Sequence, residues 1–146
     1  MNLVIAGCTR RKVATSCLVP ALELYQGSCI PQLRARLGPY AFLRGRVLFL
    51  SARHGLVHAG TPLRPYDQQL TEARAEQLRP DVMAALDREF IAGGRPEEIL
   101  LLLEPLYLLL LADLRAHPNR LMLRWIPNPG DGWEDAAAVL DMWGWP

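Results

Sequence analysis

RVLFLSARHGLVHAGTPLRPYD, residues 46–67, is the stretch of the sequence that decides the fold. Its apolar run at residues 47–50 is rich in strand-forming side chains and is typical of a strand buried on both faces. The run ends abruptly at residues 51–55, SARHG, where a hydroxyl, a guanidinium and an imidazole precede a glycine that permits a tight turn. Ligands of open α/β sheets bind outside the carboxyl ends of the strands, so this cluster indicates a functional site.

The same stretch continues through two prolines to a phenol and a carboxylate. Pro62 and Pro65 restrict the backbone on the way to Tyr66 and Asp67, and they favour fixed positions for these two side chains. The alternative is an ordinary βα loop whose polar residues only cap the next helix and contact water.

Four apolar segments alternate with amphipathic ones along the chain. We expect strands at residues 3–6, 47–50, 98–103 and 121–126, and helices at residues 20–25, 28–37, 71–93, 105–116 and 133–143. This alternation predicts an α/β fold: a single three-layer domain, residues 1–146, with a mainly parallel sheet of about four strands flanked by helices. Ser28 and Thr71 are the expected helix caps, and Pro80 is expected to kink or divide its helix.

Charge is distributed unevenly along the sequence. Residues 1–66 carry a net charge of +8 and residues 67–146 carry −7, which together give the overall +1. A basic half suits a phosphate-bearing partner, unless the two halves interleave in space and cancel. Glu23 is the only acid of the basic half, and it is either half of a surface ion pair or a catalytic carboxylate. The turn at residues 7–12, GCTRRK, suits an anion but lacks the spacing of known nucleotide-binding loops.

Several classes of protein are disfavoured by the composition. Cys8, Cys17 and Cys29 are odd in number and lack a C-x-x-C pair, which indicates reduced thiols in a cytoplasmic protein. The apolar residues 99–111 include a glutamate and a proline and are too short to span a bilayer, so we expect no membrane association. His54 and His58 have no evident third partner, so we expect no metal, and no cofactor is expected either.

Four short motifs occur in order and resemble one known family. They are GCTxxK at residues 7–12, ELYxxS at 23–28, LSARHGL at 50–56 and PYD at 65–67. They resemble a bacterial domain family with the pattern GCSxxK, ELYxxS, LSAK[YH]GL and PYD, over about residues 3 to 126. That family is similar to the uracil-DNA-glycosylase-like domains of tRNA deazaguanine-modification enzymes and of anti-phage DNA glycosylases. Thr9 and Arg53 replace a serine and a lysine, and Glu104 stands where a glycine commonly precedes the tyrosine, here Tyr107.

The resemblance implies cleavage or exchange of a bond between base and sugar. On this hypothesis the protein is an N-glycosidase acting on a nucleotide or modified nucleic acid, with Asp67 and Glu23 as catalytic carboxylates. The residues expected to bind substrate are polar or aromatic members of the four motifs: Cys8, Thr9, Arg11, Lys12, Tyr25, Ser28, Ser51, Arg53, His54 and Tyr66. The main alternative is a non-catalytic module that binds nucleotide or nucleic acid in the same pocket, and a purely structural interaction protein is a third.

Overall fold

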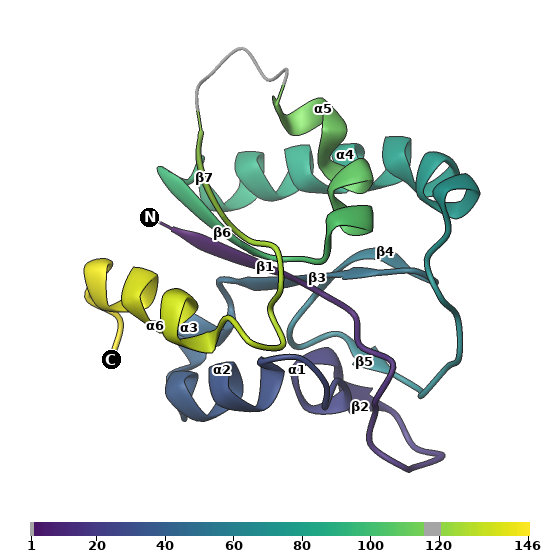
Figure 1. Ribbon diagram of the computed structural model, residues 1–146, viewed down its shortest axis with the longest axis horizontal. Coiled ribbons are helices and arrows are strands. Elements are labelled where there is room, and N and C mark those ends of the chain that lie inside the picture. Colours follow the sequence, from purple (N-terminus) through teal and green to yellow (C-terminus); the bar gives the residue numbers. More distant parts are fainter. Residues whose placement is uncertain (1, 116–120) are drawn as a thin grey trace.

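The computed structural model describes residues 2–115 and 121–146, apart from the side chain of Arg115. Its centre is a five-stranded sheet with the order β4-β3-β1-β6-β7 (Figure 1). The strands are β1 (Leu3–Gly7), β3 (Val47–Ser51), β4 (Gly55–His58), β6 (Glu98–Leu102) and β7 (Met122–Ile126). All neighbouring pairs are parallel except β3 and β4, so the predicted α/β fold with a mainly parallel sheet is confirmed.

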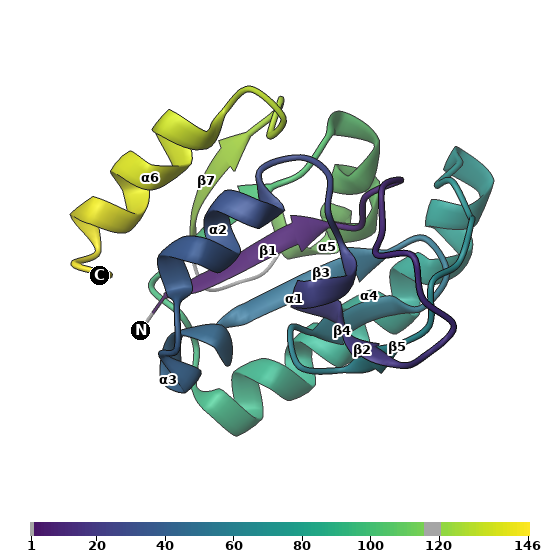
Figure 2. The same cartoon turned by 90° about the horizontal axis from the view of Figure 1, so that it is seen from below.

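Helices cover both faces of this sheet, which gives three layers (Figure 1). One layer contains α1 (Ala21–Leu24), α2 (Ile30–Leu37), α3 (Ala41–Arg44) and α6 (Trp133–Met142). The other contains α4 (Glu72–Gly93), the 3-10 helix η1 (Pro105–Leu111) and α5 (Ala112–Arg115). Seen from below, α6 runs along the β7 side of its layer, and α1 lies on the β3 side (Figure 2). The short strands β2 (Val19–Pro20) and β5 (Pro62–Leu63) pair with each other outside the main sheet.

The central strands are buried on both faces because successive side chains point to opposite layers. In β1, Leu3 and Ile5 pack among the residues of the α4 layer, whereas Val4 and Ala6 pack among those of the α2 layer. All four are at most 4% exposed. Unbroken apolar runs therefore mark strands here, and the four predicted strands are confirmed.

The segment after β3 differs from the prediction. Residues 52–54 form the turn of a β-hairpin, and Gly55 has a φ of 75°, which glycine adopts without strain. The chain then returns as β4, antiparallel to β3, rather than running directly as a loop into the next helix. The polar cluster at residues 51–55 is thus mainly a hairpin turn.

The helices agree with the prediction except in detail. The Thr71 side chain accepts a hydrogen bond from the Arg74 amide, 3.1 Å away, and caps α4 as expected. Pro80 lies inside α4 but does not divide it. Ser28 does not cap α2, because the capping position is occupied by Cys29 and no side-chain bond is made there. The Leu-rich segment is mostly 3-10 helix rather than α-helix, and residue 116 lies outside the described residues.

The order of the strands creates a crevice at one end of the sheet. From β1 the chain moves outward to β3, and then it crosses beyond β1 to form β6 and β7 on the other side. Connections that diverge in this way leave open space outside the carboxyl ends of the two strands where they part, here β1 and β6. Among the described residues, no helix has both the length and the apolar character needed to cross a bilayer.

Gly132 provides a test of the packing between β7 and α6. A Cβ atom there would overlap the Ile126 side chain and lie 2.9 Å from the Asn128 carbonyl oxygen. We expect Gly132→Ala to lower the free energy of unfolding by about 1–3 kcal/mol, as overpacking does. Gly130→Ala is the matched control, since its nearest neighbour would be 3.7 Å away. Urea unfolding of both variants measures the difference, and equal stabilities would contradict the packing described.

Candidate functional site

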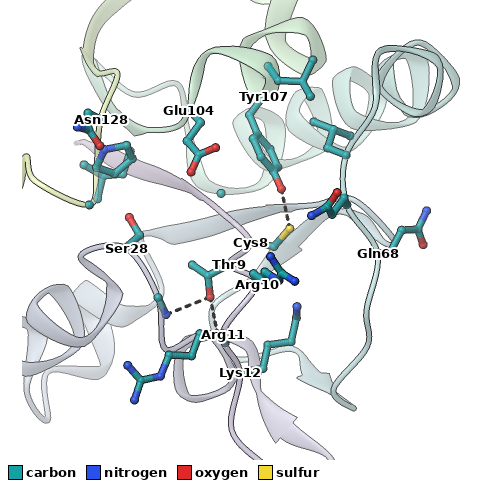
Figure 3. Close-up of a pocket in the computed structure, with 18 of the residues that line it drawn as sticks. Cys8, Thr9, Arg10, Arg11, Lys12, Ser28, Gln68, Glu104, Tyr107 and Asn128 are labelled. Atoms are coloured by element: carbon teal, nitrogen blue, oxygen red, sulfur yellow. Dashed lines mark hydrogen bonds between the residues drawn. The ribbon is translucent and has the colours of Figure 1, made fainter.

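A cavity of about 490 Å³ lies at the carboxyl ends of the parallel strands (Figure 3). Its walls come from the ends of β1 and β6 and from residues that follow β1 (8–12), β6 (104, 106 and 107) and β7 (128–130), together with residues 27–28 and 67–70. The cavity therefore lies in the crevice between β1 and β6 that the strand order predicts.

The basic turn after β1 is held in place by backbone contacts. The Thr9 hydroxyl donates to the Arg11 carbonyl oxygen at 2.7 Å and accepts from the Gly27 amide at 3.2 Å. A Cβ on Gly27 would lie 2.9 Å from the Thr9 Cβ, so this close approach requires glycine. The Val13 amide also donates to the Leu24 carbonyl oxygen at 3.0 Å. These bonds fix the turn before any ligand arrives.

Lys12 is the most constrained cation of the turn. Its ammonium lies 4.5 Å from the centroid of the Tyr66 ring and 5.9 Å from that of Tyr25, which favours the charged form. Burial lowers the pKa of Lys12, and the nearby Cys8 and Asp67 charges oppose this shift. Figure 3 shows the ammonium pointing towards Cys8, whereas the Arg11 guanidinium points away from it. Lys12 is therefore better placed than Arg11 to meet an anion in the cavity.

Cys8 and Tyr107 join the two sides of the crevice. The Cys8 Sγ lies 3.0 Å from the Tyr107 hydroxyl oxygen, and it accepts a hydrogen bond from the Ala52 amide at 3.4 Å. Burial, reinforced by the charge of Cys8, raises the pKa of Tyr107 above its ordinary value. Tyr107 therefore keeps its proton at neutral pH and is able to donate it to the sulfur.

Two carboxylates line the cavity. Asp67 lies in the segment before α4, and its charge acts on Lys12. Glu104 follows β6, and its carboxylate points towards the space between Ser28 and Tyr107 (Figure 3). Since Thr71 caps α4, helix capping does not account for Asp67.

Ser51, Tyr66 and Tyr25 form a buried chain of hydroxyl groups that does not reach the cavity. The Ser51 oxygen lies 2.6 Å from the Tyr66 hydroxyl, which lies 2.7 Å from the Tyr25 hydroxyl. Ser51 also accepts from the amides of Arg53 and His54 at 3.2 and 3.0 Å, which leaves its own hydrogen for Tyr66. Burial raises the pKa of Tyr25 to about 12 and that of Tyr66 as well. The chain stabilises the hairpin turn and the platform beneath Lys12.

The structure gathers only part of the predicted site. The predicted residues that line the cavity are Asp67, Cys8, Thr9, Arg11, Lys12 and Ser28. Those that lie elsewhere are Glu23, Tyr25, Ser51, Arg53, His54 and Tyr66. Glu23 forms an ion pair with Arg44, which agrees with the non-catalytic alternative for this residue. The His54 and Tyr66 rings pack in a T-shaped arrangement, and burial, followed by the charge of Arg53, lowers the pKa of His54.

The polar residues that line the cavity but were absent from the predicted site are Arg10, Gln68, Gln69, Glu104, Tyr107 and Asn128. Glu104, Tyr107 and Asn128 follow the predicted strands at residues 98–103 and 121–126. Their position just after a predicted strand could therefore have identified them as candidate site residues. Within residues 2–115 and 121–146, no three His, Cys, Asp or Glu side chains gather in a way that would hold a metal ion.

Tyr66→Phe tests the buried hydroxyl chain. The change leaves the Ser51 hydroxyl hydrogen without an acceptor and removes the partner of the Tyr25 hydroxyl, so we expect the free energy of unfolding to fall by about 1–3 kcal/mol. Tyr40→Phe is the control, because Tyr40 is 52% exposed and should tolerate the loss of its hydroxyl. Urea unfolding compares the two variants, and an unaffected Tyr66→Phe protein would show that the chain contributes little.

Comparison with known proteins gives no assignment. No family model matches this sequence, and neither a curated protein nor a solved structure matches it. The family resemblance of its motifs therefore stays an expectation, and the function has to be argued from the cavity itself.

Proposed function

We propose that the protein is an N-glycosidase that hydrolyses or exchanges the bond between base and sugar in a nucleotide or modified nucleic acid. One observation carries the proposal: a single cavity is lined by the cations of residues 10–12 and by the carboxylates of Asp67 and Glu104. A carboxylate can stabilise the sugar cation that such a reaction forms, and cations in the same pocket can bind the phosphate of the substrate.

The basic turn supplies the phosphate end of the proposed site. Lys12 is held by the aromatic platform, and exposed Arg10 lies beside it in the same fixed turn. A compact ammonium and a guanidinium are both effective ligands for a phosphate. We therefore place the 5′-phosphate of the substrate against residues 10–12.

Asp67 supplies the charge that the sugar needs. As the bond to the base breaks, the base leaves with the electron pair and takes up a proton from solvent, and positive charge develops on the sugar. A fixed carboxylate stabilises this cation, and it accepts a proton from the water that adds to the sugar carbon. Asp67 acts electrostatically on Lys12, so it lies near the phosphate end, where the sugar of a bound nucleotide follows the phosphate.

Glu104 replaces Glu23 as the second carboxylate of the proposal. Glu23 is held by Arg44 outside the cavity, whereas Glu104 points into it (Figure 3). Glu104 stands where the resembling family commonly has a glycine. On this proposal it contributes a carboxylate to the cavity rather than only occupying space there. Asp67 remains our first assignment because of its position beside Lys12.

The size of the cavity suits one nucleotide. Its volume of about 490 Å³ falls in the ordinary range for small-molecule sites. A base within a duplex has to leave the stack before it fits such a cavity. The proposed substrate is therefore a free nucleotide, or a single nucleotide extruded from a strand.

The rival function is binding without chemistry, and Asp67→Asn separates the two. The variant keeps the side-chain shape and removes the charge, so we expect release of free base to fall about a hundredfold or more. The melting temperature should change little, since Asp67 is exposed and does not cap α4. Release is measured by mass spectrometry with nucleotides, RNA and modified DNA.

Asp81→Asn on the exposed side of α4 is the matched control and should keep full activity. Unchanged release in Asp67→Asn would transfer the catalytic role to Glu104, which Glu104→Gln then tests. Ligand binding without any release in the unmodified protein would favour the binding module.

Lys12→Met tests the phosphate end. We expect the dissociation constant of a nucleoside monophosphate to rise about tenfold, and its dependence on salt to weaken, because one phosphate contact is lost. Binding to the unmodified protein should also weaken as the pH rises through the lowered pKa of Lys12, below the usual 10.5, because only the protonated amine attracts phosphate. Exposed Arg64 lies outside the cavity, so Arg64→Met is the control. Calorimetric titration that finds no difference between the variants would contradict this placement.

A further inference from the structure

Lys12 is the only lysine in the sequence, and it lines the cavity. The other fifteen of the sixteen Lys and Arg residues are arginines. An arginine binds phosphate as readily as a lysine does, but its guanidinium stays protonated and does not act as a nucleophile. A lysine amine can lose its proton and form a Schiff base with an aldehyde. Lys12 therefore gives the cavity a chemical capability that its neighbours Arg10 and Arg11 lack.

The backbone of Lys12 is held by pairing with the segment before α2. Lys12 forms an isolated antiparallel bridge with Tyr25. On one side of this bridge the Gln26 amide donates to the Arg11 carbonyl oxygen at 2.9 Å, and on the other side the Val13 amide is also bonded. The side chain that carries the amine therefore extends from a fixed point in the cavity wall.

The amine itself is unpaired. Within residues 2–115 and 121–146, the Lys12 Nζ makes neither a hydrogen bond nor an ion pair, and it contacts the faces of the Tyr66 and Tyr25 rings. Burial lowers its pKa despite the opposing charges of Cys8 and Asp67. At a given pH, more of this amine is therefore neutral than in a lysine surrounded by water, and the neutral amine is the nucleophile.

We propose that Lys12 is the nucleophile of a second activity, a lyase reaction that cuts a DNA strand at an abasic deoxyribose. The inference rests on the proposed function for the source of this sugar. When the substrate is a nucleotide extruded from DNA, base release leaves a sugar whose ring opens to an aldehyde at C1′. The phosphate of that sugar lies at residues 10–12 in the proposed site, so the freed aldehyde carbon is tethered close to the Lys12 amine.

The reaction proceeds by addition, elimination and hydrolysis. The neutral amine adds to the C1′ carbonyl carbon, and loss of one water leaves a protonated C=N bond. Removal of a proton from C2′ gives an enamine, whose electrons expel the 3′-phosphate together with the C3′–O bonding pair. Water then hydrolyses the remaining imine, which releases an unsaturated aldehyde and restores Lys12. Asp67 lines the same cavity and interacts with Lys12, and we assign it the C2′ proton.

Reductive trapping on a ready-made abasic strand tests the lyase directly. The probe is a DNA oligonucleotide with a single abasic deoxyribose, so no base has to be released first. Sodium cyanoborohydride should reduce the imine to a stable amine, and mass spectrometry of the resulting peptides should find the adduct on Lys12. Without the reductant, the unmodified protein should cut the strand on the 3′ side of the abasic site.

Lys12→Arg separates the amine from the positive charge. This variant should lose both the adduct and the strand cleavage. It should still bind an oligonucleotide with a tetrahydrofuran residue, which resembles the abasic sugar but has no aldehyde. Adding Arg64→Lys to Lys12→Arg supplies an exposed lysine outside the cavity as a matched control. The double variant should stay as inactive as Lys12→Arg, since its amine is not positioned against the sugar.

The outcomes separate the lyase from the function on which it rests. The lyase is overturned by a missing adduct, by an adduct on the N-terminal amine, by equal trapping in Lys12→Arg, by trapping restored with Arg64→Lys, or by an adduct without strand cleavage. Base release is measured on the same preparations with intact nucleotides and DNA. Release without trapping rejects the lyase and keeps the N-glycosidase, whereas trapping and cleavage without release keep the lyase and reject the N-glycosidase.

Discussion

The parallel pairing of β1 with a strand on each side is the constraint on which the rest of the structure depends. Four of its five residues are buried, and they pack alternately into the two helical layers. β3 pairs with it along one edge and β6 along the other, so the chain has to diverge at the carboxyl end of β1. That divergence opens the crevice, and Gly7 and Cys8 are among the residues that line it. The topology therefore predicts a ligand site at this end before any side chain is considered.

The lining of the cavity is held in place by contacts within the protein. The Thr9 hydroxyl bridges the basic turn to Gly27, and Tyr66 lies beneath the Lys12 ammonium while its own hydroxyl is held by Ser51. Motif residues thus divide into those that line the cavity and those that support it. A sequence motif does not distinguish the two roles, because the residue type alone does not show whether a hydroxyl group is buried or exposed.

The strands and helices could be predicted from sequence because an apolar run or a four-residue stripe is a local property. The order of the strands could not be predicted, because the apolar run at residues 47–50 does not show which strands pair with it in the sheet. The prediction therefore centred the site on the end of β3, whereas the cavity lies between β1 and β6 and includes Glu104. The hairpin was missed for a related reason: β4 is a short edge strand, exposed in part, and lacks a strong apolar pattern.

The uneven charge of the chain has a local explanation in the structure. Several cations of the basic half are bound by other groups of the protein. Arg36 forms an ion pair with Asp141, and Arg44 forms one with Glu23. Arg34 and Arg46 donate hydrogen bonds to backbone carbonyl oxygens. Residues 10–12, by contrast, line the cavity, and the carboxylates that line it with them, Asp67 and Glu104, come from the acidic half. The two halves therefore neither cancel uniformly nor form one basic surface. They meet at the cavity, where cations from the basic half and carboxylates from the acidic half line the same space.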